Sequence, residues 1–353
     1  MNEMMPYILE QPDLCQRMLA NCAALAAPFV QAVATYRPDR LLLVASGTSR
    51  NAACAAAPFM EWVLGLPVTV VAPSCLEAVA GKKPLLVFIS QGGNSTNTIA
   101  AIENHRDTPS LALTGNPDGE INQLCNSTVT IPCGPEKAGP KTKGYTSTVL
   151  LLYLMALEAA RTSGTLSVSD YDKVVEALQT SFAAMPENLR RIQAWQDANL
   201  DTLKSMQTVY VIGKKQDALV GAEGALKLLE TILTPAFAFD FEEFLHGPAC
   251  SLDNRVAGFY LLPDDADRPR MERLAALHRE SNRAVYLLSH SESTDPRDLC
   301  LLGSSVWYTA PFEMILPFQL ISDTLPSIVG TDGVGHERFV TLDSRLKIKA
   351  KAE

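Results

Sequence analysis

Short apolar runs rich in valine, isoleucine and leucine alternate with helix-length segments through the first half of the chain. The runs predict strands at residues 41–46, 68–72, 85–90, 110–114 and 128–132. The intervening and following segments predict helices at residues 51–64, 95–105 and 146–161. This alternation is typical of a parallel sheet whose strands are joined by crossover helices. It predicts one five-stranded α/β lobe.

The same pattern restarts in the second half of the chain. Strands are predicted at residues 209–213, 257–262, 284–289 and 305–309, and helices at 217–233, 268–282 and 311–328. Before this restart, a polar stretch at 163–169 precedes a helical connector at 171–206, which we expect to break at Pro186. Two lobes of similar order indicate an internal duplication.

Five parts are therefore expected along the chain. They are a helical opening segment at residues 1–38, a first lobe at 39–165, a helical connector at 166–206, a second lobe at 207–335 and a C-terminal tail at 336–353. The length of 353 residues exceeds that of a typical single hydrophobic core, which agrees with two lobes.

Composition and charge exclude several classes of protein. With 47% hydrophobic and 20% charged residues, the chain has the composition of a globular protein. Its net charge of −9 and lack of a basic stripe argue against a nucleic-acid partner, and we interpret the basic tail from Lys347 to Lys351 as a solvated end. Apolar runs too short for a bilayer and the absence of a secretory signal predict a cytoplasmic protein without a membrane partner.

The cysteines give no sign of a metal site. All eight are scattered along the chain, and they form no Cys-x-x-Cys pair and have no histidine at ligand spacing. We therefore expect no metal ion.

The turn that follows the predicted strand at 85–90 has the composition of an anion site. It contains Ser90, Gln91, two glycines and Ser95, and it leads directly into a predicted helix. Main-chain N–H groups at a helix N-terminus and serine hydroxyls favour phosphate, and glycine lets the main chain approach it closely. The alternative is that Ser95 only caps its helix.

A second turn of the same composition follows the first predicted strand. It contains Ser46, Gly47, Thr48 and Ser49. Turns at the carboxyl ends of parallel strands meet at one edge of the sheet, so we expect the two turns to converge.

The predicted helix at 217–233 has three charged residues on one face. Glu223, Lys227 and Glu230 are spaced at i, i+4 and i+7, which places them about a quarter turn from an apolar stripe. That stripe consists of Leu219, Ala222, Leu226, Leu229 and Leu233. The charges either line a binding site on the flank of the buried face or form an exposed ladder of ion pairs worth about 0.3–0.5 kcal/mol each.

Few histidines are available for acid or base catalysis. Of the five in the chain, His246 has the most suggestive setting, because it lies after two glutamates and before a Gly-Pro turn. Alone, such a histidine is more often structural.

Taken together, these segments resemble the SIS (sugar isomerase) family, in particular the isomerase half of glucosamine-6-phosphate synthase and related phosphosugar deglycases. Residues 46–49 resemble its first sugar-binding turn, and residues 90–95 its phosphate loop, in which Gly92 replaces a serine. Residues 223–230 are similar to its catalytic helix and 243–248 to its histidine turn. The motifs occur in the family order, and the resemblance covers about residues 40–345.

The resemblance implies a fold, an assembly and a set of site residues. The fold would be α/β, with two SIS lobes, each a parallel sheet of about five strands flanked by helices. Glu230 would be the base that moves a proton between C1 and C2 of an open-chain sugar, and His246 would assist ring opening or the leaving group. The substrate and its phosphate would be bound by Thr48, Ser49, Ser90, Gln91, Ser95, Glu223, Lys227 and Arg338. A homodimer or larger homo-oligomer with shared sites, and a tail that closes on the site, are also implied.

One departure from the synthase changes the expected reaction. The synthase has a tail lysine that helps to open the sugar ring, and Arg338 lies at about that position. Arginine stays protonated and forms no Schiff base. No glutaminase half precedes residue 40, so we expect no complete synthase.

The chain then resembles most a deglycase that cleaves a 6-phosphorylated sugar–amine adduct, such as fructoselysine or glucoselysine 6-phosphate, to hexose 6-phosphate and free amine. This chemistry needs no metal or redox cofactor. A ketose/aldose phosphate isomerase and an amino-sugar-phosphate deaminase are the alternatives within the enzymes. A non-catalytic sugar-phosphate sensor is the alternative of another class.

Overall fold

A computed structural model describes residues 4–76 and 83–350. The chain forms two compact units. The N-terminal unit consists of Asp13–Lys137, Lys143–Glu176 and Arg338–Glu353, and the C-terminal unit of Met1–Pro12, Ala138–Thr142 and Ala177–Glu337.

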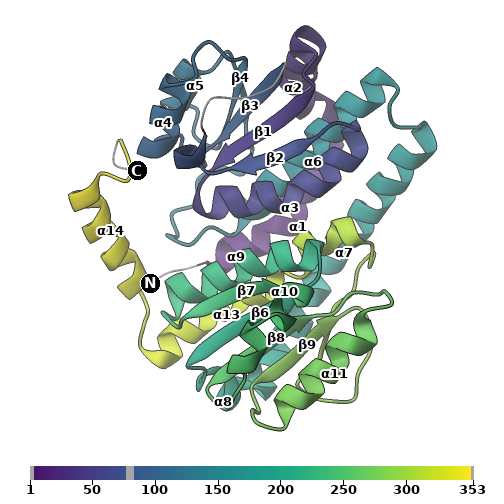
Figure 1. Cartoon of the computed structure of the whole chain (residues 1–353), viewed down its shortest axis with the longest axis vertical. Helices are drawn as coiled ribbons and strands as arrows, with labels where there is room; N and C mark the ends of the chain where they lie inside the picture. Colours follow the sequence, from purple (N-terminus) through teal and green to yellow (C-terminus); the bar gives the residue numbers. More distant parts are fainter. Residues whose placement is uncertain (1–3, 77–82, 351–353) are drawn as a thin grey trace. The chain divides into compact units, whose positions relative to one another are not determined.

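The N-terminal unit is built on a parallel sheet with the strand order β2-β1-β3-β4-β5 (Figure 1). Its strands are β1 (Arg40–Ala45), β2 (Val68–Val71), β3 (Pro84–Ile89), β4 (Ser110–Thr114) and β5 (Ser127–Thr130). The helices of this unit are α2 (Cys22–Tyr36), α3 (Gly47–Leu64), α4 (Thr96–Glu103), α5 (Ile121–Leu124) and α6 (Lys143–Ser163), with a 3₁₀ turn η1 (Pro73–Cys75). The predicted strands and helices of the first lobe are confirmed, with differences only at their ends.

Burial explains why these strands have continuous apolar sequences. Every residue of β4 is buried, as are five of the six residues of β3. Helices α4 and α5 pack on one face through Ile99, Ile102 and Ile121. A sheet covered on both faces has no solvent-facing row, so its strands do not alternate between apolar and polar residues.

The C-terminal unit repeats this architecture. Its parallel sheet has the strand order β10-β9-β8-β6-β7. The strands are β6 (Thr208–Gly213), β7 (Ala236–Asp240), β8 (Val256–Leu261), β9 (Val285–Ser289) and β10 (Leu299–Cys300). The helices are α8 (Leu200–Leu203), α9 (Gln216–Thr231), α10 (Phe241–Leu245), α11 (Arg268–Arg279), α12 (Ala310–Glu313) and α13 (Leu316–Val329), with 3₁₀ turns η2 (Pro248–Ser251) and η3 (Trp307–Thr309). The predicted class, α/β with two five-stranded parallel sheets flanked by helices, is confirmed.

Two strands of the second sheet differ from the prediction. The predicted strand at 305–309 is wrong, because Ser305 has a left-handed φ of 53° and Trp307–Thr309 form the 3₁₀ turn η3. The edge strand is instead the short β10. Strand β7 was not predicted, because it is short and the polar residues of the histidine turn follow it directly.

The helical connector consists mainly of one continuous helix, where the sequence predicts a break. Helix α7 runs from Val168 to Ala198 without a break at Pro186, so the predicted break is wrong. A proline inside a helix costs about 3 kcal/mol. Around it, Phe182, Met185 and Leu189 are buried, and their packing offsets that cost.

The opening segment is helical, as predicted, in its described part. Helices α1 (Met5–Ala20) and α2 are joined at a bend of 60°. None of the described helices could cross a membrane by itself, and only this bent pair, taken together, has the necessary length and apolar composition.

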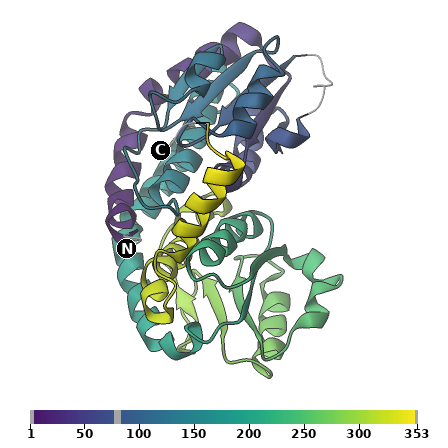
Figure 2. The same cartoon turned by 90° about the vertical axis from the view of Figure 1, so that its left-hand side faces the viewer.

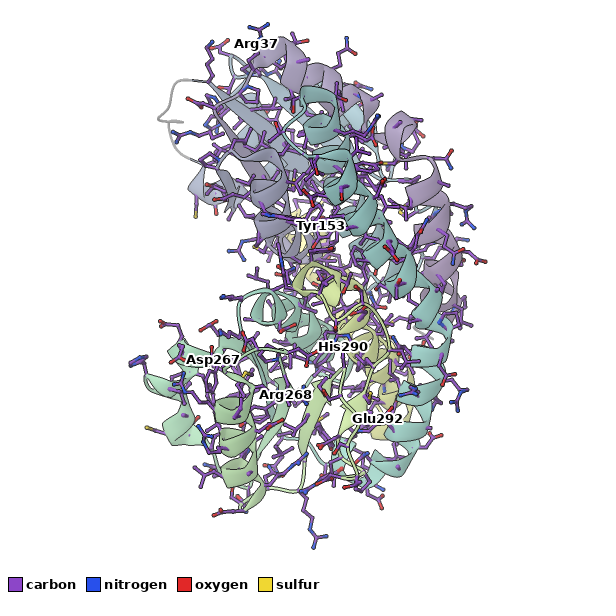
Figure 3. The ribbon with its side chains drawn as sticks, turned by 90° about the vertical axis from the view of Figure 1, so that its right-hand side faces the viewer. Arg37, Tyr153, Asp267, Arg268, His290 and Glu292 are labelled. Atoms are coloured by element: carbon purple, nitrogen blue, oxygen red, sulfur yellow. The ribbon has the colours of Figure 1, made fainter. Side chains whose placement is uncertain are left out.

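A buried ion pair lies at the carboxyl edge of the second sheet. His290, labelled in Figure 3, follows β9, and its Nε2 lies 2.8 Å from Oε2 of the fully buried Glu313. Thr309 Oγ1 and the Ser304 amide also donate to this carboxylate, at 3.2 and 3.1 Å. Burial alone would lower the pKa of His290, but Glu313 more than offsets this, so the pKa of His290 is raised.

This raised pKa makes the fold less stable in alkali. A histidine whose pKa is higher in the folded state stabilises the protein fully below about pH 6.5, and this contribution is lost as the pH rises through the folded pKa. We expect the melting temperature of wild type to exceed that of His290→Gln most near pH 6, and the difference to shrink as the solution becomes alkaline. A difference that stays constant with pH in thermal melts would contradict this assignment.

Candidate functional site

The serine pair of the phosphate-type turn is assembled at the carboxyl end of β3. Ser90 follows the strand and Ser95 is the N-cap residue of α4, and their Oγ atoms lie 3.1 Å apart. The Ser95 hydroxyl makes no capping hydrogen bond to its helix. Capping therefore does not explain this side chain, and the two neighbouring hydroxyls favour the interpretation as an anion site.

A neighbouring loop fixes the main chain of this turn. Gly93 has φ +71°, and a Cβ atom there would lie 2.6 Å from Cα of Gly119. The two loops therefore contact each other through their glycines. Asn116 Nδ2 donates to the Gly92 carbonyl at 3.1 Å, and the Glu120 amide donates to Asn94 Oδ1 at 3.2 Å. The sequence pattern did not predict these supporting residues. It indicated only that a glycine-containing turn follows the next strand.

The side chain of Gln91 is fixed by neighbours within the N-terminal unit. Its Nε2 donates to Sγ of the buried Cys133 at 2.8 Å, and Thr148 Oγ1 donates to its Oε1 at 3.5 Å. Burial raises the pKa of the Cys133 thiol, which keeps this sulfur neutral. Gln91 thus supports the shape of the turn.

The first serine-rich turn lies beside the second. Thr48 and Ser49 are in the first turn of α3 and are half-buried. Asn97 Nδ2, at the start of α4, donates to Ser46 Oγ at 2.9 Å. This hydrogen bond joins the two turns at one edge of the sheet, where the candidate ligands Ser90 and Ser95 also lie.

The charged residues of α9 form a buried triad in the C-terminal unit. The side chains of Glu223 and Lys227 are 0% and 1% exposed, and Glu230 is 32% exposed. Lys227 Nζ lies 3.1 Å from Glu223 Oε1 and donates a hydrogen bond to Glu230 Oε1. An exposed ladder of surface ion pairs is therefore excluded.

Electrostatics keep the lysine of this triad charged. Burial alone would lower the pKa of Lys227, but the two glutamates more than offset this and raise it above its usual range. A buried ammonium with two carboxylate partners fixes the position of both. Glu230 is the member of the triad that retains access to its surroundings.

The buried face of α9 is not the predicted apolar stripe. Leu229, a member of that stripe, is 45% exposed, whereas the face with Gly221 and Gly224 is buried. A Cβ atom at Gly221 would lie 2.9 Å from Val211 Cγ1 of β6, and one at Gly224 would lie 2.7 Å from the Phe318 ring of α13. Glycine lets the helix approach these elements closely, and this close packing buries the charged triad.

A further segment of the C-terminal unit covers the end of α9. Thr331 Oγ1 donates to the Thr231 carbonyl at 3.0 Å, and a Cβ atom at Gly335 would lie 2.1 Å from the Glu230 carbonyl oxygen. The sequence analysis did not single out Thr331 and Gly335. Helix α14 (Val334–Leu346) begins at this point.

The two remaining candidates, His246 and Arg338, are exposed. His246 is the C-cap residue of α10, and its amide donates to the Glu243 carbonyl at 3.1 Å. Arg338 lies on α14. Among the described residues, no hydrogen bond or ion pair joins the His246 side chain to Glu230. The roles of His246 and Arg338 stay predictions.

Comparisons with known proteins agree with the motifs. The SIS domain family matches residues 35–158. A putative sugar binding protein from Salmonella typhimurium LT2 is 30% identical, with a TM-score of 0.82 over 91% of this chain and 99% of that chain. The chain belongs to the SIS family. A putative phosphosugar isomerase from Clostridium difficile 630, also similar to this SIS protein, is 25% identical, with a TM-score of 0.85 over 92% of this chain and 93% of that chain.

The curated relatives are longer than this SIS protein. Glutamine–fructose-6-phosphate aminotransferase (isomerizing) from Streptococcus pneumoniae strain R6 is 25% identical over 334 residues, which are 90% of this chain and 54% of the relative. The corresponding enzyme from Oceanobacillus iheyensis is 30% identical over 298 residues, 80% of this chain and 48% of the relative. The chain thus spans about half the length of the curated relatives it matches.

The buried triad predicts a large loss of stability when its cation is removed. Lys227→Met leaves the Glu223 carboxylate buried without its cation, and we expect the free energy of unfolding to fall by about 3–5 kcal/mol in urea titrations. The matched variant Lys173→Met removes an exposed lysine, and we expect almost no change. Equal stabilities of the two variants would contradict the buried triad.

The serine pair predicts a loss of affinity for sugar phosphates. We expect Ser90→Ala to weaken fructose 6-phosphate binding about tenfold in calorimetric titrations, because one hydroxyl donor is lost. Ser163→Ala, an exposed serine at the end of α6, serves as the control. Unchanged affinity of Ser90→Ala would assign the anion to another place.

Proposed function

We propose that this SIS protein is a deglycase, which cleaves a 6-phosphorylated sugar–amine adduct to hexose 6-phosphate and a free amine. The observation that supports it most directly is the triad of α9. Glu230 is a partly exposed carboxylate whose orientation is fixed by the buried ammonium of Lys227. A carboxylate that is both positioned and accessible is suited to general acid–base catalysis.

The proposed reaction moves one proton between two neighbouring carbons. For a fructosamine 6-phosphate, Glu230 removes a proton from C1, the C1–H electron pair forms C1=C2, and the C2 carbonyl oxygen takes up a proton from water, which gives an enaminol. The protonated Glu230 returns its proton to C2 while the nitrogen gives up its own proton to water, which leaves a C1=N imine and a C2 hydroxyl. Water adds to C1, and the C1–N bond breaks to release the amine and an aldehyde, which is glucose 6-phosphate. Glu230 ends the cycle as a carboxylate.

Other residues supply binding and assistance. The serine pair Ser90 and Ser95 is assigned to the phosphate, with Thr48 and Ser49 nearby on the same sheet edge. His246, exposed after α10, is assigned to ring opening or to the leaving amine. The proposal keeps the expected homodimer or larger homo-oligomer with shared sites and the cytoplasmic location.

Arg338 supports a deglycase reaction over that of the curated relatives. The resemblance places it at about the position of the synthase's ring-opening lysine, and an arginine stays protonated. The same proton transfer at Glu230 would serve a ketose/aldose phosphate isomerase, which makes that reaction the principal competitor in the test.

The proposal predicts adduct hydrolysis that depends on Glu230. We expect the purified protein to release hexose 6-phosphate from at least one member of a panel of 6-phosphorylated fructosamines and glucosylamino adducts. Release is measured with a coupled dehydrogenase. We expect Glu230→Gln to lower kcat about 10²-fold or more, because the amide cannot accept the proton.

The control and the contrary outcomes are defined in the same assay. Glu103→Gln removes an exposed carboxylate of α4 and is expected to keep the wild-type rate. Failure to cleave any adduct, combined with a Glu230-dependent interconversion of aldose and ketose phosphates, would replace the deglycase by an isomerase. Equal rates for wild type and Glu230→Gln would remove Glu230 from the chemistry.

A further inference from the structure

The C-terminal tail turns sharply at the end of α14. Lys347 has a left-handed φ of 54°, and its amide donates to the Asp343 carbonyl at 2.8 Å, which ends the helix. Asp343 accepts a second hydrogen bond through its side chain, because the Lys349 amide donates to Asp343 Oδ1 at 2.8 Å. One aspartate therefore fixes the direction of the following residues.

The turned tail pairs with the phosphate-type turn, and both segments belong to the N-terminal unit. The Thr96 amide donates to the Ile348 carbonyl at 3.1 Å, and the Ala350 amide donates to the Asn94 carbonyl at 2.8 Å. Thr96 Oγ1 also donates to the Lys347 carbonyl at 2.6 Å. Figure 1 shows the yellow segment that follows α14 beside α4, and Figure 2 shows the same yellow segment against the blue elements of the N-terminal unit. Lys347 is exposed, as expected of a solvated end, but residues 348–350 pair with the turn, and Lys351 lies outside the described residues.

The register of this pairing places one lysine at the serine pair. Ser95 and Lys349 are directly opposed in an antiparallel bridge. Directly opposed residues project to the same side, with Cβ atoms about 4.5–5.5 Å apart. Lys349 is half-buried, whereas its neighbour Lys347 is exposed. A lysine side chain is long enough to reach past the Ser95 hydroxyl to a ligand that this hydroxyl binds.

The phosphate-type turn has no positively charged side chain of its own. Residues 90–98 contain no lysine or arginine, and Gly92 supplies no hydroxyl. The Thr96 amide, one of the donors through which a helix N-terminus binds anions, is already bonded to the Ile348 carbonyl. A phosphate dianion at Ser90 and Ser95 would thus lack a positive partner within the turn itself.

We propose that Lys349 is a phosphate-binding residue of this site, brought to the serine pair by the tail. The inference rests on the proposed function only in taking a sugar phosphate as the ligand. It adds a specificity determinant outside the turn motif, because the ammonium favours phosphorylated ligands over the free sugar. The tail thereby supplies the donor that the turn lacks at Gly92.

Binding measurements on the full chain test this role without requiring turnover. Calorimetric titrations with fructose 6-phosphate, inorganic phosphate and unphosphorylated fructose are compared for wild type, Lys349→Gln and Lys347→Gln. The second variant is the matched control, because it removes an exposed lysine of the same tail and leaves its carbonyl contact with Thr96 intact. We expect Lys349→Gln to weaken both phosphate ligands about tenfold, Lys347→Gln to weaken them less than about twofold, and Lys349→Arg to restore most of the affinity.

The outcomes separate this inference from the proposed function. If wild type binds fructose 6-phosphate and Lys349→Gln binds it as tightly as Lys347→Gln does, the role of Lys349 is overturned while the site at Ser90 stands. Tighter binding by Lys349→Gln would also overturn it, since the tail would then exclude phosphate. If wild type binds neither phosphate ligand, both the inference and the proposed function fail. Melting curves of all variants verify that each one is folded.

Discussion

The burial of one ammonium group constrains the C-terminal unit more than any other interaction. Lys227 is fully buried between Glu223 and Glu230, and leaving a buried charge without its partners costs several kcal/mol. Such a triad forms only if α9 lies very close to β6 and α13, which Gly221 and Gly224 permit. The same packing that pays this desolvation cost also fixes Glu230, the carboxylate to which we assign the chemistry.

The two units share one architecture but carry different polar groups at their sheet edges. Each has a five-stranded parallel sheet, and the polar residues gather where the strands end. In the N-terminal unit this edge holds hydroxyls and a tail lysine at Ser95, a set suited to an anion. In the C-terminal unit it holds the buried His290–Glu313 pair, while the charged triad lies on α9. The two sheet edges therefore carry different chemical groups.

Much of this could be predicted from the sequence, because apolar runs define buried parallel strands and turn residues define their ends. The serine turns and the spacing of the α9 charges could also be predicted. The buried face of α9 could not, because glycines contact the sheet there while Leu229 remains exposed. The break predicted at Pro186 was wrong for a related reason, because tertiary packing offset the local tendency of proline to end a helix. The pairing of Lys349 with Ser95 joins residues too distant in sequence for any local pattern to predict.

We propose that Glu230 moves a proton from C1 to C2 before the amine leaves. A fructosamine 6-phosphate that bears deuterium at both C1 positions tests this step. We expect the released hexose 6-phosphate to be glucose 6-phosphate with a single deuterium at C1, as measured by NMR spectroscopy. Release of fructose 6-phosphate with both C1 deuterium atoms retained would contradict it, because the C–N bond would then break without any proton transfer at C1.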